Sequence, residues 1–500
     1  MISLQKIFLI NLIAIVAPGT AFAIQDGPSD VGSVYPGDVV APISDDADTN
    51  SAEKYSTRYS TSKLEQALGP ASYLITDQHS ANDFTAAIRR AVGRHPSFHA
   101  SSSDLGESDA LRRQAKSALY PQLSAQLRGD YSLTREFAAG TDNVVESLRP
   151  REQYTAGISA SQLIFDGGAT IQRIRGARAV DREYRYAMST QINNLALSAL
   201  TAYHDVAAHQ ALVAFTQAFI QRNEQILEDV KERERLGAGS KADVTRAFAR
   251  LSAAKARLAE IRESKRFADI NYEEFFGEVP PQLKRPGMAT PDVTSRNETV
   301  ATALEENPEV SVAQARVDAR QADFKVAKSA RLPEVRLSVD AVKYDIFEGG
   351  DDFDVRAGLN INYNIFGGGS RAAEIAIARS RARKEKFNEE QVRKEVARDA
   401  AMAFERLQGA DARLASLADA LVAHDETRDL VLERYKLSRG DLIDVLQAEN
   451  DYFDAGVAYL IGLSSRDIAG YALMEHTGDL LRLFSPENEY NDARFGGVNG

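Results

Sequence analysis

The sequence predicts a mainly helical exported protein that carries a pair of transmembrane β-hairpins and is built as an internal two-fold repeat. Three observations predict this fold class. A leader-like segment opens the chain, a set of short motifs recurs at one fixed offset, and alternating apolar and polar stretches precede segments of unusual length without glycine or proline.

The composition indicates a folded protein and excludes several functions. The 500 residues are 44% hydrophobic and 26% charged, as in ordinary globular chains. The formal net charge of −12 argues against nucleic-acid binding through phosphate neutralisation. Cysteine is absent, which excludes disulfides, thiolate metal sites and cysteine nucleophiles.

Residues 1–23 have the pattern of a signal peptide. Lys6 is followed by an apolar run, Ile7 to Ala17, and by the small-x-small site Ala21-Phe22-Ala23. This run is too short to span a bilayer, and a buried N-terminal helix is the alternative. We expect export and a mature chain that begins near Ile24. No later apolar run reaches the length of a transmembrane helix, so membrane insertion would require strands.

Residues 24–80 differ in composition from the rest. They contain nine acidic and three basic residues and four prolines, with little periodic apolar spacing. This predicts an acidic, low-complexity arm that is disordered or loosely attached and dispensable for assembly. The alternative is an extended segment that docks on a partner.

Two copies of one unit follow. Six residues of the first copy recur 201 positions later: Arg233, Leu236, Gly239, Asp243, Val244 and Ala247 match Arg434, Leu437, Gly440, Asp444, Val445 and Ala448. The motif that starts at Phe165 recurs at Phe366 with the same offset. We predict repeat 1 at 81–276, a linker at 277–300, repeat 2 at 301–475 and a C-terminal tail at 476–500.

Each repeat contains one long β-hairpin, predicted at 121–165 and 333–366. Apolar and polar residues alternate with period two on both arms, for example from Leu123 to Leu133 and from Val355 to Ile365. Strands of ten residues or more exceed the usual globular length and match a tilted transmembrane strand. The two hairpins supply only four strands, and about eight are the minimum for a closed barrel. We therefore expect a barrel shared between chains.

The remainder is helix of unusual length. Ala177 to Leu236 contains neither glycine nor proline, and Arg371 to Arg439 contains only Gly409. Each segment could extend about 90 to 100 Å at about 1.5 Å per residue. Turns at 236–243 and 437–444 precede returning helices, which predicts antiparallel coiled-coil pairs.

These motifs resemble those of the TolC-like outer-membrane channel family. The resemblance rests on the Phe-x-Gly-Gly hairpin exits, on the run Arg434 to Ala448 and on its partner Arg233 to Ala247, and it covers about Asn82 to Leu480. It implies a homotrimer with a 12-stranded outer-membrane β-barrel, continued by a long periplasmic α-helical barrel. It also implies contact with outer-membrane lipid, a periplasmic adaptor (membrane-fusion) protein and an inner-membrane ABC or RND-type transporter. The loops Phe137 to Arg149 and Ile346 to Asp352 would face outside.

The resemblance also implies roles for particular residues, in four groups. They are a pore constriction (Asp444, Gln447), gate contacts at the tips (Asp243, Tyr435, Gly239, Gly440), adaptor-facing tips (Leu236, Gly237, Leu437, Ser438) and hairpin exits (Phe165, Gly167, Gly168, Phe366, Gly368, Gly369). Tyr435 would bond Asp243. Gln447 replaces a second ring acid and Gly440 a linking basic residue, so a weaker gate is expected. Alternatively, Asp243 and Asp444 only cap the returning helices.

The expected function is passive conduction in a tripartite export system, with type I protein secretion placed first. Small-molecule efflux of drugs or metals is the alternative, and a periplasmic coiled-coil scaffold is an alternative of another class. No nucleophile elbow or complete phosphate loop occurs, and the histidines are scattered, so we expect no enzyme, cofactor or metal site.

Overall fold

The computed structural model describes residues 59–76, 78–79, 81–134, 136, 151–286, 293–347 and 352–485. The expected signal peptide, residues 24–58 of the acidic arm, the loop Phe137 to Arg149 and the last fifteen residues lie outside this part of the chain. Most of the loop Ile346 to Asp352 does as well.

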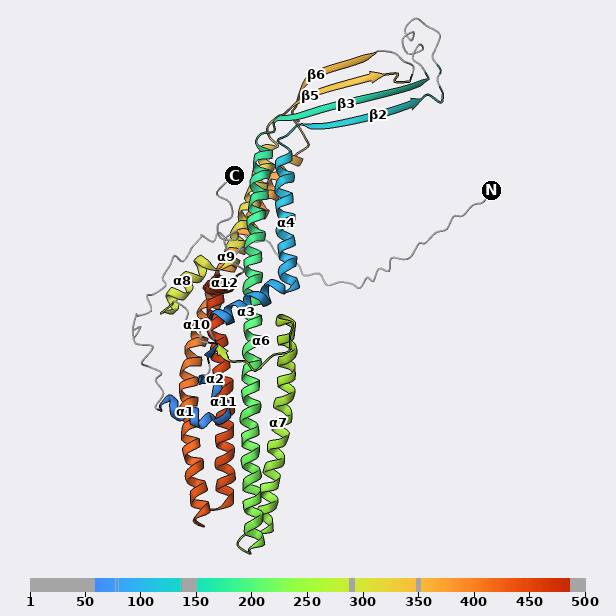
Figure 1. Ribbon diagram of the computed structural model, residues 1–500. Helices are drawn as coiled ribbons and strands as arrows, with labels where there is room; N and C mark the ends of the chain where they lie inside the picture. Colours follow the sequence, from blue (N-terminus) through green and yellow to red (C-terminus); the bar gives the residue numbers. More distant parts are fainter. Residues whose placement is uncertain are drawn as a thin grey trace, which may run out of the picture. The chain divides into compact units, whose positions relative to one another are not determined.

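Six long helices, three from each repeat, form the body of the described chain, and Figure 1 shows their arrangement. They are α4 (Pro96–Ser117), α6 (Ala169–Arg235) and α7 (Lys241–Phe276), followed by α9 (Pro308–Ser329), α10 (Ser370–Lys436) and α11 (Leu442–His476). α6 and α10 have 67 residues each, and at about 1.5 Å per residue they are roughly 100 Å long. α4 and α9 begin alike, since His95 and Asn307 cap them and proline follows at the first helical position.

Shorter elements gather around the middle of the long helices (Figure 1). They are α1 (Thr61–Leu68), η1 (Gly69–Ala71), α2 (Tyr73–Thr76), β1 (Gln78–His79), α3 (Ala81–Arg94), β4 (Arg285–Pro286), α8 (Arg296–Glu306) and α12 (Asp479–Phe484). β1 and β4 pair in parallel. This pairing joins the segment before repeat 1 to the segment between the repeats.

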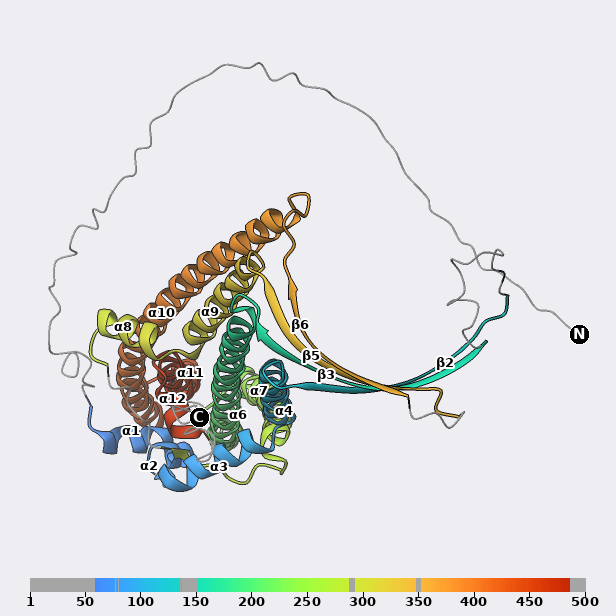
Figure 2. The same ribbon diagram turned by 90° about the horizontal axis from the view of Figure 1, so that it is seen from above.

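Four strands form one antiparallel sheet in the order β2-β3-β5-β6. They are β2 (Gln122–Tyr131), β3 (Glu152–Phe165), β5 (Glu334–Tyr344) and β6 (Phe353–Asn362). Each strand continues a helix: α4 precedes β2, α6 follows β3, α9 precedes β5 and α10 follows β6. The helices contact one another in the corresponding order, α4-α6-α9-α10. Viewed from above, the sheet curves away from this row of helices (Figure 2).

The sheet has one apolar and one polar face. Pairing places Leu127 beside Ala156, Val339 beside Ala357 and Leu337 beside Leu359, all on one face. The alternate residues are mostly polar, such as Gln126 opposite Gly157 and Arg336 opposite Asn360. Leu127 and Leu359 are 72% and 61% exposed. The apolar face is therefore uncovered in a single chain.

A buried ion pair fixes the segment between the repeats. Arg285 donates two hydrogen bonds of 2.6 Å to the carboxylate of Asp467 on α11, which is almost fully buried. His204 of α6 lies against the same carboxylate, with 3.7 Å between Nδ1 and Oδ2. Burial lowers the pKa of His204 to about 4, so the imidazole is neutral and Arg285 supplies the compensating charge.

The predicted boundary of the acidic arm at residue 80 is wrong. Ala67, Leu68 and Ala71 are completely buried in the main hydrophobic core. The Tyr452 hydroxyl donates to the carbonyl oxygen of Ala67 (2.6 Å), and Lys63 pairs with Glu426 of α10 (2.6 Å). Apolar contact thus holds Thr61–Thr76 against the helices.

The predicted tail likewise begins too early at residue 476. Helix α12 packs Leu480 and Phe484 into the same core, and both side chains are buried. Arg482 pairs with Asp479 and lies 3.5 Å from a carboxylate oxygen of Glu306.

We predict that Leu68→Ala destabilises the helical part by about 2 to 4 kcal/mol, because a completely buried leucine leaves a cavity. Lys63→Ala, which removes an exposed ion pair with Glu426 and a contact with the ring of Tyr59 but leaves no cavity, should cost much less. Chemical denaturation followed by circular dichroism measures both. Equal effects would show that α1 is not part of the core.

Candidate functional site

The turn between α6 and α7 ends the first long helix with a Schellman motif. Ala238 N donates to Arg233 O (2.8 Å) and Gly237 N to Glu234 O (2.9 Å). Gly237 has φ +77°, the left-handed conformation that this motif requires. A Cβ on Gly239 would lie 3.1 Å from Glu234 N, a tight contact that the backbone would have to relieve by a few tenths of an ångström.

The turn between α10 and α11 repeats this geometry with different residues. Arg439 N donates to Arg434 O (2.9 Å) and Ser438 N to Tyr435 O (3.0 Å). Ser438 takes the position of Gly237 with φ +56°, a conformation that is strained for a residue with a side chain. A Cβ on Gly440 would meet Tyr435 N at an ordinary 3.5 Å, so this turn is more open.

Asp243 caps its own helix in the described chain. Ser240 Oγ accepts from Asp243 N (3.2 Å), and Asp243 Oδ2 accepts in return from Ser240 N (3.4 Å), which completes a capping box. The Ser240 hydroxyl also donates to Asp243 Oδ2 (2.7 Å). Arg246, one turn later, lies 3.2 Å from the other carboxylate oxygen. Within one chain, Asp243 therefore acts as the sequence analysis described in its alternative: it caps the returning helix α7.

Tyr435 contacts Arg233. The guanidinium carbon lies 4.1 Å from the centre of the ring, and Arg233 Nη2 donates to the Tyr435 carbonyl oxygen (3.1 Å). Among the described residues, no hydrogen bond joins Tyr435 to Asp243. The two tips are instead joined through Arg233, a residue that the sequence indicated only as the repeat partner of Arg434.

Asp444 and Gln447 lie one turn apart on the exposed face of α11. Gln447 donates to Asp451 (2.7 Å) on the same face. The side chain of Asp444 makes no hydrogen bond or ion pair with another described residue, and the N-cap Asp441 makes no side-chain capping bond. Unlike that of Asp243, the carboxylate of Asp444 is free to meet charges from outside the chain. Leu236 and Leu437 are exposed at the two turns.

A buried ionic network holds α6, α10 and α11 together above the tips. Arg222 Nε donates to Glu449 Oε1 (2.5 Å), and Arg428 lies over the ring of Tyr452 at 4.1 Å while pairing with Asp425 (2.7 Å). Burial raises the pKa of Glu449, and Arg222 opposes that shift. The network restrains α11 relative to α6.

The hairpin exits are shaped by their glycines. Gly168 and Gly369, both with left-handed backbone, cap α6 and α10. A Cβ on Gly167 would lie 2.7 Å from Ser329 O, whereas the matching Gly368 is open. Phe165 and Phe366 are exposed beside these turns.

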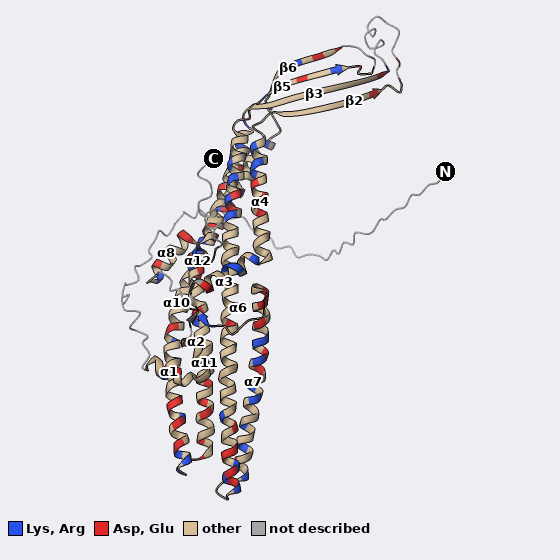
Figure 3. Ribbon diagram, in the orientation of Figure 1, with Lys and Arg blue, Asp and Glu red and all other residues tan. Residues whose placement is uncertain are grey.

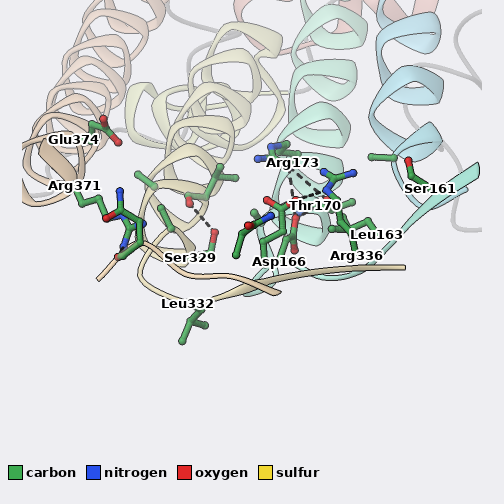
Figure 4. A pocket seen from close by; sticks show the side chains of 18 of the residues that line it. Ser161, Leu163, Asp166, Thr170, Arg173, Ser329, Leu332, Arg336, Arg371 and Glu374 are labelled. Carbon is green, nitrogen blue, oxygen red and sulfur yellow. Dashed lines mark hydrogen bonds and ion pairs between the residues drawn. The ribbon is translucent and has the colours of Figure 1, made fainter. Parts of the chain in front are cut away.

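A polar cavity of about 530 Å³ lies at the exits, between the polar face of the sheet and the helix ends. Figure 4 shows Asp166, Thr170 and Arg173 together on one side, with Arg371 and Glu374 on the other. Asp166 accepts from Thr170 N (2.7 Å) and so caps the first turn of α6. The cavity places charged side chains where strands and helices meet.

The sequence profile of the outer membrane efflux protein family matches residues 87–271 and 299–479. The chain belongs to this family. The two matched segments correspond to the two repeats and include both tips and both hairpins. Proteins of this family are transport proteins, the outer-membrane efflux channels of tripartite systems.

Named relatives of this family match over most of the chain. Outer membrane efflux protein BepC of Brucella suis is 26% identical over 433 residues, which cover 84% of this chain and 92% of the relative. Pyoverdine export outer membrane protein OpmQ of Pseudomonas aeruginosa is 25% identical over 372 residues, covering 71% and 77%. Protein CyaE of Bordetella pertussis is 24% identical over 380 residues, covering 74% and 78%.

Solved structures share the fold. CusC has a TM-score of 0.70 at 16% identity, covering 79% of this chain and 92% of its own. VceC of Vibrio cholerae has a TM-score of 0.69 at 18% identity, covering 82% and 98%. The predicted fold class is confirmed: it is that of trimeric channels in which a β-barrel continues into an α-helical barrel. Within the described residues, no helix combines the length and apolarity needed to cross a bilayer.

Gly237 and Ser438 occupy equivalent positions in the two turns, so exchanging their residue types tests the cost of a left-handed backbone. We predict that Ser438→Gly stabilises its turn by about 0.5 to 1 kcal/mol and that Gly237→Ser destabilises the other turn by a similar amount. Both positions have left-handed backbone, and no atom crowds a Cβ at Gly237, so the effect is conformational. Amide hydrogen exchange of the two turns measures it. Changes of the same sign in both variants would contradict the argument.

Proposed function

We propose that three copies of this chain form one outer-membrane channel that conducts substrate passively from the periplasm to the outside. One observation carries the proposal: the four-stranded sheet and the row of helices share the same order and have open edges on both sides. Three copies supply 3 × 4 = 12 strands, more than the approximately eight that a barrel requires. Closure then satisfies the edge strands β2 and β6.

The two faces of the sheet support this placement. The exposed apolar face, which includes Leu127 and Leu359, suits contact with outer-membrane lipid, and the polar face suits a water-filled lumen. A periplasmic coiled-coil scaffold has no use for such a sheet. The helices then extend into the periplasm, and export through a cleaved signal peptide at 1–23 follows from this location.

The tips are the part of the chain farthest from the sheet (Figure 1). In this orientation they point toward the inner membrane. Leu236, Gly237, Leu437 and Ser438 are exposed there and provide the contact for a periplasmic adaptor protein. An ABC or RND-type transporter in the inner membrane supplies the energy, because channels of this family work with inner-membrane transporters in tripartite systems.

Type I protein secretion and small-molecule efflux are two uses of the same conduit. The sequence placed protein secretion first. The names of two relatives, an efflux protein and a pyoverdine export protein, favour efflux as the use to test beside it. Deleting the gene and measuring both secreted proteins and retained small molecules separates the two.

The gate lies at the tips in this proposal. Three copies of Asp444, with Gln447 one turn deeper, form a ring at the constriction, and the Arg233–Tyr435 contact keeps the two tips of each chain together. Gly239 allows the close passage of the chain in the first turn, and Gly440 has the matching position in the more open second turn. Because Asp444 is unpartnered in the described chain, its carboxylate is available to bind cations.

The membrane placement predicts a parity effect. Leu127→Arg or Leu359→Arg should reduce the stability of the assembled barrel by about 2 to 4 kcal/mol, because a charge would face lipid. Arg128→Leu and Asn360→Arg, one position away on the polar face, should be mild. Trimer recovery from outer membranes and heat dissociation in detergent measure the effect. Equal losses of trimer stability from substitutions on the two faces of the sheet would rule out the assignment of the apolar face to lipid.

The gate is tested by single-channel conductance in planar bilayers. Asp444→Ala should abolish block by multivalent cations added from the tip side. Arg233→Ala should raise conductance, whereas Tyr435→Phe should not, since it keeps the ring and the carbonyl oxygen that Arg233 contacts. Purified protein that inserts without forming any channel would overturn the proposed function. Unchanged conductance in Arg233→Ala would overturn only the gate.

A further inference from the structure

Helix α10 is an edge helix with an unusual exposed surface. In the upper row, α4 and α10 each contact one long neighbour, α6 and α9 respectively, and so turn one face outward. Between residues 379 and 386, α10 carries five basic residues and one acidic residue. Figure 3 shows a concentration of Lys and Arg on the helices near the sheet.

Most of these basic side chains have no polar partner among the described residues. Arg379 lies over Phe324 of α9, but Arg381, Arg383, Lys384 and Lys386 make no ion pair or hydrogen bond with another described residue. Ile377 and Phe387 flank them and are 49% and 68% exposed. On a helix, residues 377, 384 and 387 share one face. Ile377 and Arg381 stand at the margin of this face, where they also line a groove beside α9. This face of α10, Ile377 to Phe387, is apolar at both ends and basic in the middle.

Helix α4 presents the complementary pattern on the opposite edge. Asp104 and Glu107 are exposed and unpaired among the described residues, and Leu111 is exposed one turn above Glu107. Below them, Ala100 and Ser103 are small and exposed. This face of α4, Ala100 to Leu111, has an apolar upper end, an acidic middle and a shallow lower end.

The two faces match in height. The end of α4 and the start of α10 line the same cavity, so both helices are measured from one level. At about 1.5 Å per residue, Leu111 and Ile377 lie roughly 9 to 11 Å below it, and Glu107 and Arg381 roughly 15 to 17 Å. Ala100 and Phe387 both lie roughly 25 Å below it. When the two faces are placed together, apolar Leu111 therefore meets apolar Ile377 and acidic Glu107 meets basic Arg381. The ring of Phe387 meets the small side chain of Ala100.

We propose that the α10 face of one copy docks on the α4 face of a second copy, and that the Asp104/Glu107 to Arg381/Lys384 charges fix their register. The proposal rests on the trimeric channel proposed above and adds the side chains by which copies of this chain recognise one another. Because like charges placed together cost far more than an exposed ion pair gains, these charges act mainly by rejecting mismatched neighbours. The contact recurs three times in the ring, which multiplies the discrimination.

The lower part of the same edge supports a second copy as the occupant. There the row is α7-α6-α11-α10, so α7 replaces α4 as the opposite edge. Phe248 of α7 and Leu430 of α10 are both exposed, and each lies about 9 to 11 Å from the tip end of its helix. An apolar contact between Phe248 and Leu430 of neighbouring copies would continue, toward the tips, the proposed contact between α4 and α10. We call this whole line of contact between two copies the seam.

Charge reversal and its repair test the proposal in the full-length protein. Asp104→Lys with Glu107→Lys, and separately Arg381→Glu with Lys384→Glu, should each reduce the trimer fraction at a fixed temperature in detergent by about tenfold or more. The four substitutions together should restore it to near the native value. Glu305→Lys and Arg296→Glu on α8, which is not part of the row, are matched controls and should change nothing.

The outcomes separate this proposal from the proposed function. Failure of the combined variant to recover, or unchanged trimers in both double variants, would overturn the seam while leaving the channel intact. Absence of trimers in the native protein would overturn the trimeric channel itself. If the variant with Arg381→Glu and Lys384→Glu lost binding to anionic-lipid vesicles while its trimer stability stayed native, the α10 face would be a lipid contact and the proposal would be wrong.

Discussion

The chain has two open edges, and its other features depend on this constraint. The sheet ends in β2 and β6, whose outer N–H and C=O groups have no partner within the sheet. Each edge strand runs directly into an edge helix, α4 or α10. Unpaired backbone groups are tolerated in water but costly in lipid, so a chain of this kind reaches its stable form only when copies close the ring. The uncovered apolar face of the sheet adds the same requirement.

The helical part is restrained differently, by short segments around its middle. β1 pairs with β4, and the adjacent Arg285 bonds Asp467 on α11 beside His204 on α6. A buried carboxylate of this kind is stable only while its cation is in place, since removing one partner leaves a charge in an apolar core. The connection between the repeats thus fixes where α11 stands against α6. Below it, the Arg222–Glu449 pair repeats the restraint nearer the tips.

The sequence predicted the features that depend on local chemistry. Period-two alternation fixed the hairpins, glycine placement indicated the tips and exits, and the fixed offset between copies identified the repeat. Contacts between distant segments were not predictable in the same way. Arg233 stacks on Tyr435 across 202 positions, and Leu68 is buried although Gly69 and Pro70 follow it in a segment of acidic composition. The roles of Asp444 and Gln447 came from a resemblance, and a single chain does not bring their three copies together.

The two copies of the repeat have diverged where the chain turns. In the first, Gly237 relieves the left-handed position and Ser240 with Asp243 forms a complete capping box. In the second, Ser438 occupies the strained position and Asp441 makes no side-chain cap. Because strain and missing caps each cost about 1 kcal/mol or more, the α10–α11 turn is the less stable of the two. The same helix pair, α10–α11, carries the free carboxylate of Asp444 and the basic face of α10. The duplication has therefore left one well-capped pair, α6–α7. In the proposed channel, Asp444 and the basic face of α10 lie on the other pair, which is easier to move.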